Sequence, residues 1–262
     1  MNNSIADKLE QIARNEQLIY NAGVEKGKAE VGEGIYEEGF EAGKKSEYDA
    51  FWDSYQEYGN RTTTYEYAFA RNGWTDVTFK PKYDLIVKST ANQMFYTSYI
   101  TNLKKTLSDC GVVLDTSEAT NFNGMFQQAR TTHVPTLDMR KATSTSHAFS
   151  YSYIEEIEKI IVAETVPWQS AFMNCSRLKH LFVEGVIGQN GFNVQWSTML
   201  SRESIESIIN ALSTTTSGLT VTLSKKAVDA AIKLAEPDDD STSSGWWAWL
   251  IGTRPNWTIS LA

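Results

Sequence analysis

QSAFMNCSRL (residues 169–178) is the clearest of four related stretches that determine the fold. The other three are NQMFYTSYI (92–100), NGMFQQART (123–131) and SHAFSYSYI (146–154). Each stretch has a phenylalanine after methionine or alanine, and a small residue three positions later. The phenylalanines, spaced 31, 23 and 23 residues apart, are Phe95, Phe126, Phe149 and Phe172, and the small residues are Ser98, Ala129, Ser152 and Cys175. A recurrence at such a period is typical of solenoid proteins.

Apolar residues also recur downstream of the phenylalanines, at Val134, Leu137 and Met139, at Ile154, Ile157, Ile160 and Val162, and at Leu178, Leu181 and Val183. One coil cannot bury its own apolar face, so we expect the coils of residues 91–196 to stack on one another. The residues predicted to share the common interior are Phe95, Phe126, Phe149, Phe172, Leu137, Ile160 and Leu181. The first interval is eight residues longer than the others, which predicts a loop around Leu107 to Val113.

The pattern resembles the BspA-like leucine-rich repeats of bacterial surface proteins and gut-bacteriophage proteins. The resemblance is clearest from Ala171 to Leu181 and covers about 100 residues. The order of a coiled segment, the glycine-spaced EEGFEAGKKSEYDAFWD and then AFARNGWTDVTFKPKY is similar to leucine-rich-repeat proteins of phages and prophages in gut Firmicutes, as is the closing PNWTISLA. The resemblance implies an α/β (α+β) fold: a helical stalk, a short leucine-rich-repeat-like solenoid with parallel strands, and a mixed C-terminal cap.

Residues 1–56 have the pattern of a helical oligomerisation stalk. Ile5, Leu9, Ile12 and Ile19 follow coiled-coil spacing, and Gly23 and Gly27 would allow close helix packing. These six residues predict a homo-oligomer, a trimer or a dimer. The alternative is one amphipathic helix packed on its own domain. A helix break is expected at 31–34, because glycines weaken helices.

The solenoid is expected to have a cap at each end, since a terminal coil leaves an apolar face uncovered. Residues 57–90, rich in aromatic side chains, predict a joint and N-terminal cap with a short strand from Tyr83 to Val87. Residues 197–262 predict the C-terminal cap: a helix after Ser201, a strand at 219–224, a helix at 225–235 and a strand at 257–261. Trp246, Trp247 and Trp249 are interpreted as core residues of this cap, in preference to a sugar-stacking surface.

Charge and hydropathy exclude several classes of partner. The formal net charge is −8, and residues 1–56 carry twelve acidic against six basic residues. Without a basic stripe, the chain is not expected to bind nucleic acid. The N-terminus lacks the features of a secretory signal, and no apolar run reaches the roughly 20 residues needed to span a bilayer. We therefore expect neither export by a signal peptide nor membrane insertion, and assembly in the host cytoplasm.

No arrangement of reactive residues suggests an enzyme or a cofactor. Phosphate-binding loops, nucleophile elbows and zinc-protease motifs are absent from the sequence. Cys175 and His180 lie within one predicted coil, where Cys175 is expected to point inward. Asp238, Asp239 and Asp240 are interpreted as a solvated turn, since calcium sites need more and better spaced ligands. We expect no catalytic, metal-binding or cofactor-binding residues.

Three functions are compatible with this reading. The first is a non-enzymatic virion component, tail-tip or fibre-like, whose partners are its own copies, other virion proteins and a bacterial surface protein or glycan. The second is a bacterial adhesin or interaction protein. The third is a glycan-active tail enzyme, which the lack of a reactive constellation disfavours. The missing signal sequence favours the first, because a virion component leaves the cell by lysis.

Overall fold

In the computed structural model, the protein is described at residues 65, 66, 68–70, 74–235 and 245–262. The predicted stalk (1–56), with Ile5, Leu9, Ile12, Ile19, Gly23 and Gly27, lies outside these ranges. So do most of residues 57–73 and Asp238 to Asp240.

The described residues form four helices and nine strands. The helices are α3 (Leu103–Cys110), α4 (Arg202–Ala211), α5 (Lys225–Ala235) and α6 (Gly245–Gly252). The strands are β1 (Leu85–Ile86), β2 (Leu114–Asp115), β3 (His133–Val134), β4 (Leu137–Asp138), β5 (Glu156–Val162), β6 (His180–Gly185), β7 (Asn193–Val194), β8 (Leu219–Leu223) and β9 (Trp257–Leu261). The predicted mixture of helices and parallel strands is confirmed, since every strand pair is parallel.

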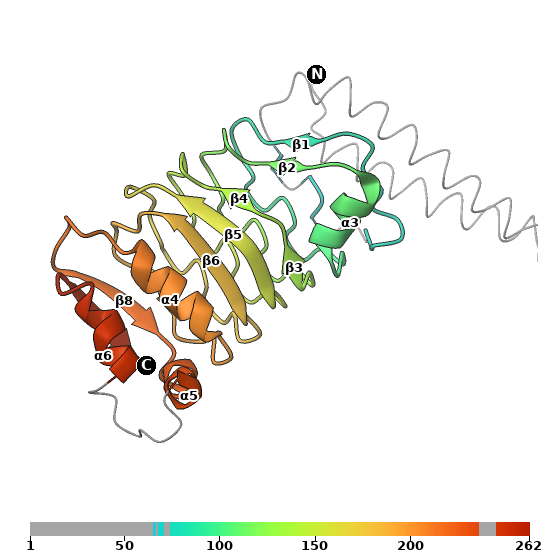
Figure 1. The fold of residues 1–262 in the computed structure, drawn as a ribbon. Coiled ribbons are helices and arrows are strands. Elements are labelled where there is room, and N and C mark those ends of the chain that lie inside the picture. The colour runs from blue at the N-terminus through green and yellow to red at the C-terminus, as the bar shows by residue number, and fades with distance from the viewer. Residues whose placement is uncertain (1–64, 67, 71–73, 236–244) are drawn as a thin grey trace, which may run out of the picture.

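Strand pairing joins residues that are about one repeat apart in the sequence. Val134 of β3 lies opposite Ile157 of β5, and Ile157 lies opposite Leu181 of β6. Likewise Leu137 of β4 is paired with Ile160 of β5. Figure 1 shows β4, β5 and β6 side by side in the middle of the molecule. The inward residues Leu137, Ile160 and Leu181 are completely buried, because alternate side chains of a strand point to one face.

The repeated phenylalanines lie in one column opposite this sheet. Ring centroids are 5.2 Å apart between Phe95 and Phe126, 6.0 Å between Phe126 and Phe149, and 5.0 Å between Phe149 and Phe172, with interplanar angles of 5°, 7° and 11°. All four side chains are at most 1% exposed. Stacked aromatic rings of this kind contribute both buried area and a favourable ring–ring interaction.

The column extends by one phenylalanine at each end. Phe69 stacks on Phe95 with centroids 5.3 Å apart, and Phe192 contacts Phe172 at the same distance. The sequence pattern places Phe69 within the aromatic-rich N-terminal cap (57–90) and gives Phe192 no position in the repeat. The intervals to these two residues, 26 and 20, differ from 23, so periodicity did not identify them.

Each internal phenylalanine is flanked by two residues with left-handed backbone. The residues two before and two after the ring have φ between 50° and 59°: Gln93 and Thr97, Gly124 and Gln128, His147 and Tyr151, Ser170 and Asn174. Only one of these eight positions is glycine, although this conformation costs other residues roughly 1–2 kcal/mol. The identical bends give each segment the same path around its ring. They are a repeat feature that residue type alone did not reveal.

The predicted loop around Leu107 to Val113 is wrong. The extra residues of the first interval form the helix α3, with Leu103 and Leu107 buried and Asn102 accepting a hydrogen bond from the Lys105 N–H as N-cap. The expected strand from Tyr83 to Val87 is shorter, since only Leu85 and Ile86 pair with β2.

At the C-terminal end the sheet stops at a helix. Ser201 caps α4 as predicted, by accepting a hydrogen bond from the Ser204 N–H. The hydroxyls of Ser204 and Ser207 in turn accept hydrogen bonds from the N–H groups of Leu181 and Val183 in β6, over 2.9 and 2.8 Å. Figure 1 shows α4 beside β6, in the place of a further strand. The helix thereby covers an edge that would otherwise be open to pairing.

The predicted strands and helix of the C-terminal cap are confirmed in β8, α5 and β9. The tryptophan run, for which no secondary structure was predicted, forms α6. Trp246 and Trp247 are buried, but Trp249 is 64% exposed, so its expected core position is wrong. On a helix, adjacent residues point in different directions, and one of three close tryptophans faces out. No helix among the described residues is long and apolar enough to cross a membrane.

The column predicts unequal effects for two phenylalanines. Phe149→Ala leaves a cavity between two stacked rings and is expected to lower the free energy of unfolding by about 3–5 kcal/mol. Phe182→Ala, on the outer face of β6 where Phe182 is 39% exposed, is the matched control and should cost less than about 1 kcal/mol. Urea denaturation of both variants measures the difference. Equal losses would show that the column does not carry the stability.

Gly185 predicts a second contrast. It ends β6 with φ 102°, and a Cβ there would overlap the backbone oxygen of Val162 in β5, whereas at Gly218 (φ 75°) a Cβ would meet nothing within 4 Å. Gly218→Ala should therefore cost only the left-handed backbone strain, about 1–2 kcal/mol. Gly185→Ala adds an overlap that the backbone must relieve, and should cost about 2–5 kcal/mol. Similar melting temperatures for the two variants would contradict the close approach of β5 and β6.

Candidate functional site

An alternating row of tyrosine and arginine side chains runs across consecutive segments of the repeat. Arg130 lies over the ring of Tyr99, with Cζ 4.5 Å from the centroid, and Arg177 lies over the ring of Tyr153 at 4.4 Å. The two pairs are in contiguous segments, because the Tyr153 N–H donates to Ala129 O over 3.0 Å. We call Tyr99, Arg130, Tyr153 and Arg177 the tyrosine–arginine row.

The row is exposed because of its distance from the column phenylalanine. Tyr99, Arg130 and Tyr153 each follow their phenylalanine by four residues, one position beyond the small buried residue. Tyr99 is 44% exposed and Tyr153 43%, and both arginines are exposed. Large aromatic side chains that remain on the surface in a regular arrangement are candidates for recognition.

The arginines of the row keep their charge available for a ligand. No carboxylate of the described residues forms an ion pair with Arg130 or Arg177. The neighbouring carboxylate of Glu155 is bound by Lys179, over 2.6 Å. That hydrogen bond and, to a lesser extent, the charge of Arg177 lower the pKa of Glu155, so this group is ionised and already paired at neutral pH.

Neutral polar side chains border the row. Thr97, Gln128 and Tyr151 lie two residues before Tyr99, Arg130 and Tyr153, and Asn174 lies three residues before Arg177. All four follow their column phenylalanine by two residues. These are the left-handed positions that follow the phenylalanines. Gln128 and Tyr151 are exposed, and Thr97 and Asn174 are half-buried. Their side chains can both donate and accept hydrogen bonds.

The strands and the turns that follow them differ from the row, because their charges neutralise one another between segments. Lys141 pairs with Glu118, Lys159 with Glu184, and Lys104 of α3 with both Glu156 and Glu158. The ion pairs are exposed and each contributes little to stability. With its charges paired in this way, the sheet face offers few groups for a charged ligand.

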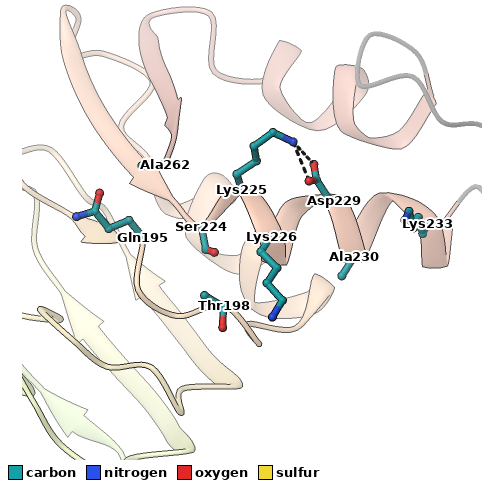
Figure 2. A pocket seen from close by; sticks show the side chains of 9 residues that line it. All are labelled: Gln195, Thr198, Ser224, Lys225, Lys226, Asp229, Ala230, Lys233 and Ala262. Carbon is teal, nitrogen blue, oxygen red and sulfur yellow. Dashed lines mark hydrogen bonds and ion pairs between the residues drawn. The ribbon is translucent and has the colours of Figure 1, made fainter.

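A depression of about 670 Å³ lies at the start of α5, far along the chain from the row (Figure 2). Lys225, Lys226 and Lys233 line it, and Lys225 is paired with Asp229 over 2.7 Å. Ser224 also lines it, but its hydroxyl is buried and makes no hydrogen bond. The depression is open and its lysines point in different directions in Figure 2. It therefore lacks the convergent polar groups of a small-molecule site.

The cysteines and histidines do not form a reactive group. Burial raises the pKa of the Cys175 thiol to about 12, and its Sγ donates to Phe149 O over 3.1 Å. His180 is exposed on β6. Both cysteines are free thiols. Within the described ranges, no three histidine, cysteine or acidic side chains are grouped closely enough to hold a metal ion.

Comparison of the chain with protein-family models, with curated proteins and with solved structures finds no match in any of the three. The geometry of the row and of the repeat is therefore the basis for assigning a function.

The two thiols predict selective labelling. Burial raises the pKa of both, but Cys110 is only half-buried whereas Cys175 is 1% exposed. Because the thiolate is the reactive form, Cys175 in the folded protein should react with an aromatic disulfide reagent on the order of 100-fold more slowly than Cys110. Absorbance measurements of thiol release on Cys110→Ser and Cys175→Ser assign each rate. Fast labelling of Cys110→Ser without denaturant would overturn the buried assignment of Cys175.

Proposed function

We propose that this chain is a non-enzymatic binding protein of a bacteriophage virion, tail-tip or fibre-like. In this proposal residues 91–196 are a short leucine-rich-repeat-like solenoid that presents its surface to a protein or to a host-cell surface. Residues 1–56 are the stalk that joins copies of the chain into a trimer or a dimer, and residues 57–90 and 197–262 are the caps.

The observation that carries the proposal is the tyrosine–arginine row. A stack of segments repeats any surface side chain at a fixed interval, which makes an extended binding surface available without a cleft. The row places on such a surface two exposed aromatic side chains and two arginines that form no ion pair with any residue the structure describes. Tyrosine and arginine are enriched among residues that dominate binding energy. A cleft with paired acids or an activated nucleophile would instead support an enzyme.

The resemblance to BspA-like repeats supports a role in recognition, and the same resemblance extends to a bacterial adhesin or interaction protein. The virion and the adhesin hypotheses differ in where the chain is found. Density-gradient fractionation of a lysed culture followed by peptide mass spectrometry separates them. Recovery with the particles supports the virion role. Recovery only with the cell envelope supports the adhesin, and recovery with neither contradicts both.

Recognition by the row is tested with two single variants of the full chain. Tyr153→Ala should weaken binding of the labelled protein to host cells about tenfold, since central aromatic residues often contribute more than 1 kcal/mol. Phe182→Ala, similarly exposed but on the sheet face, is the matched control and should change binding less than twofold. Binding is measured by flow cytometry over a concentration series. Equal affinity of Tyr153→Ala and the unmodified chain would exclude the row as the contact surface.

A further inference from the structure

We infer that the tyrosine–arginine row binds an anionic polysaccharide in which an acidic sugar alternates with a neutral one. The inference rests on the proposed function, which it makes specific by naming the class of ligand. Its basis is the charge of the row, the interval between its arginines and the chemistry of the side chains around it.

Charge is the first argument. Arg130 and Arg177 have no ion-pair partner among the described residues, and Lys179 beside them neutralises Glu155. The row is thus locally positive on a chain whose formal net charge is −8. A cationic strip on an acidic protein attracts an anion to that strip and repels it elsewhere. Guanidinium groups bind carboxylate, sulfate and phosphate through two parallel hydrogen bonds.

The interval between the arginines is the second argument. They stack on equivalent tyrosines that lie two segments apart. The rings of the corresponding part of the column are 6.0 and 5.0 Å apart, and parallel neighbours in a sheet are separated by about 5 Å, so the arginines recur at about 10 Å. One disaccharide of an extended polysaccharide has about this length, and each acidic sugar would then meet one arginine.

An extended peptide fits this interval less well. On one face of a β-strand, neighbouring side chains are about 6.8 Å apart and every second one is about twice as far. Neither distance matches the interval of about 10 Å between the arginines. A polyproline II peptide with an acidic residue at every third position has a matching period of about 9 Å. Such peptides bind in open aromatic grooves, whereas here a guanidinium covers a face of each row tyrosine. The acidic polyproline II peptide is therefore the competing ligand in the test.

The side chains beside the row are the third argument. Gln128, Tyr151 and Asn174 precede row residues by two or three positions in consecutive segments. Their amide and hydroxyl groups can donate hydrogen bonds to sugar hydroxyls and accept them. The left-handed backbone at each of these positions fixes the direction in which the side chain leaves the segment. A neutral sugar between two acidic ones would meet Tyr151, which lies in the segment between those of the arginines, whereas Gln128 and Asn174 each share a segment with an arginine.

The test uses the full chain and hyaluronan oligosaccharides, which alternate glucuronate with N-acetylglucosamine, as the probe. Dextran serves as the neutral control, and a Pro-Pro-Glu repeat peptide as the competitor. The variant Arg130→Gln/Arg177→Gln removes two positive charges from the row. The variant Arg140→Gln/Lys141→Gln removes two exposed positive charges from the turn after β4, where they pair with Asp138 and Glu118, and so matches the change in net charge.

Calorimetric titration at several salt concentrations should show hyaluronan binding that Arg130→Gln/Arg177→Gln weakens at least tenfold, whereas Arg140→Gln/Lys141→Gln changes it less than twofold. The inference would be overturned if the two variants weakened hyaluronan binding equally, or if the unmodified chain did not bind hyaluronan. It would also be overturned if dextran bound as tightly as hyaluronan, or if the peptide bound more tightly. Thermal melts of both variants verify that they fold. If the unmodified chain binds host cells but not hyaluronan, only the ligand assignment is overturned, whereas Tyr153→Ala on cells tests the function itself.

Discussion

Four of the six column phenylalanines donate a backbone hydrogen bond that joins their segment to the next one. The N–H groups of Phe69, Phe95, Phe126 and Phe149 bond to the carbonyls of Met94, Met125, Ala148 and Ala171 over 2.7–2.9 Å. A shift of one residue would bring Tyr96 or Gln127 into the place of a ring, so register and ring stacking require each other. The left-handed residues on both sides of the ring give every segment the same bend. The parallel sheet pairs residues at nearly the same interval: 23 residues where β3 and β4 meet β5, and 24 and then 23 where β5 meets β6, because the register shifts between Ile157 and Ile160.

The sequence predicted the parts of the fold that repeat at a fixed period. Phe126, Phe149 and Phe172 recur every 23 residues, and the helical and extended patterns after Ser201 are of ordinary length. The prediction failed where an additional element lengthened the interval between two phenylalanines. The eight additional residues between Phe95 and Phe126 form the helix α3. Its exposed face is polar, so the sequence did not reveal that Leu103 and Leu107 are buried. Phe69 and Phe192 were missed because they lie 26 and 20 residues from the neighbouring column phenylalanines, and not 23. Trp249 was misassigned because a run of apolar residues does not show which side of a short helix faces solvent.

The sequence predicted partners for the chain but no residues of a binding site. Tyr99, Arg130 and Tyr153 each follow their phenylalanine by four residues, but Arg177 follows Phe172 by five. An alignment on the phenylalanines therefore places Ser176 in the row instead of Arg177. The Arg177 guanidinium reaches the ring of Tyr153 only in the folded chain, so the spacing of the sequence does not reveal this contact. Binding surfaces of repeated segments are harder to predict than their interiors, since only the interior must satisfy the packing of its neighbours.

The closure of β6 by α4 has a consequence for how such a chain changes in length. Ser204 and Ser207 use the N–H groups that a following strand would need, so this side of the sheet cannot grow at its end. An internal segment, such as the one around Phe149, donates backbone hydrogen bonds to the segment that follows it and accepts them from the segment before it. Gene duplication can therefore copy that unit in place without creating an unmatched edge. Longer homologues would then contain additional segments in the middle of the stack. They would retain α4, with its two serines, at the end of the sheet.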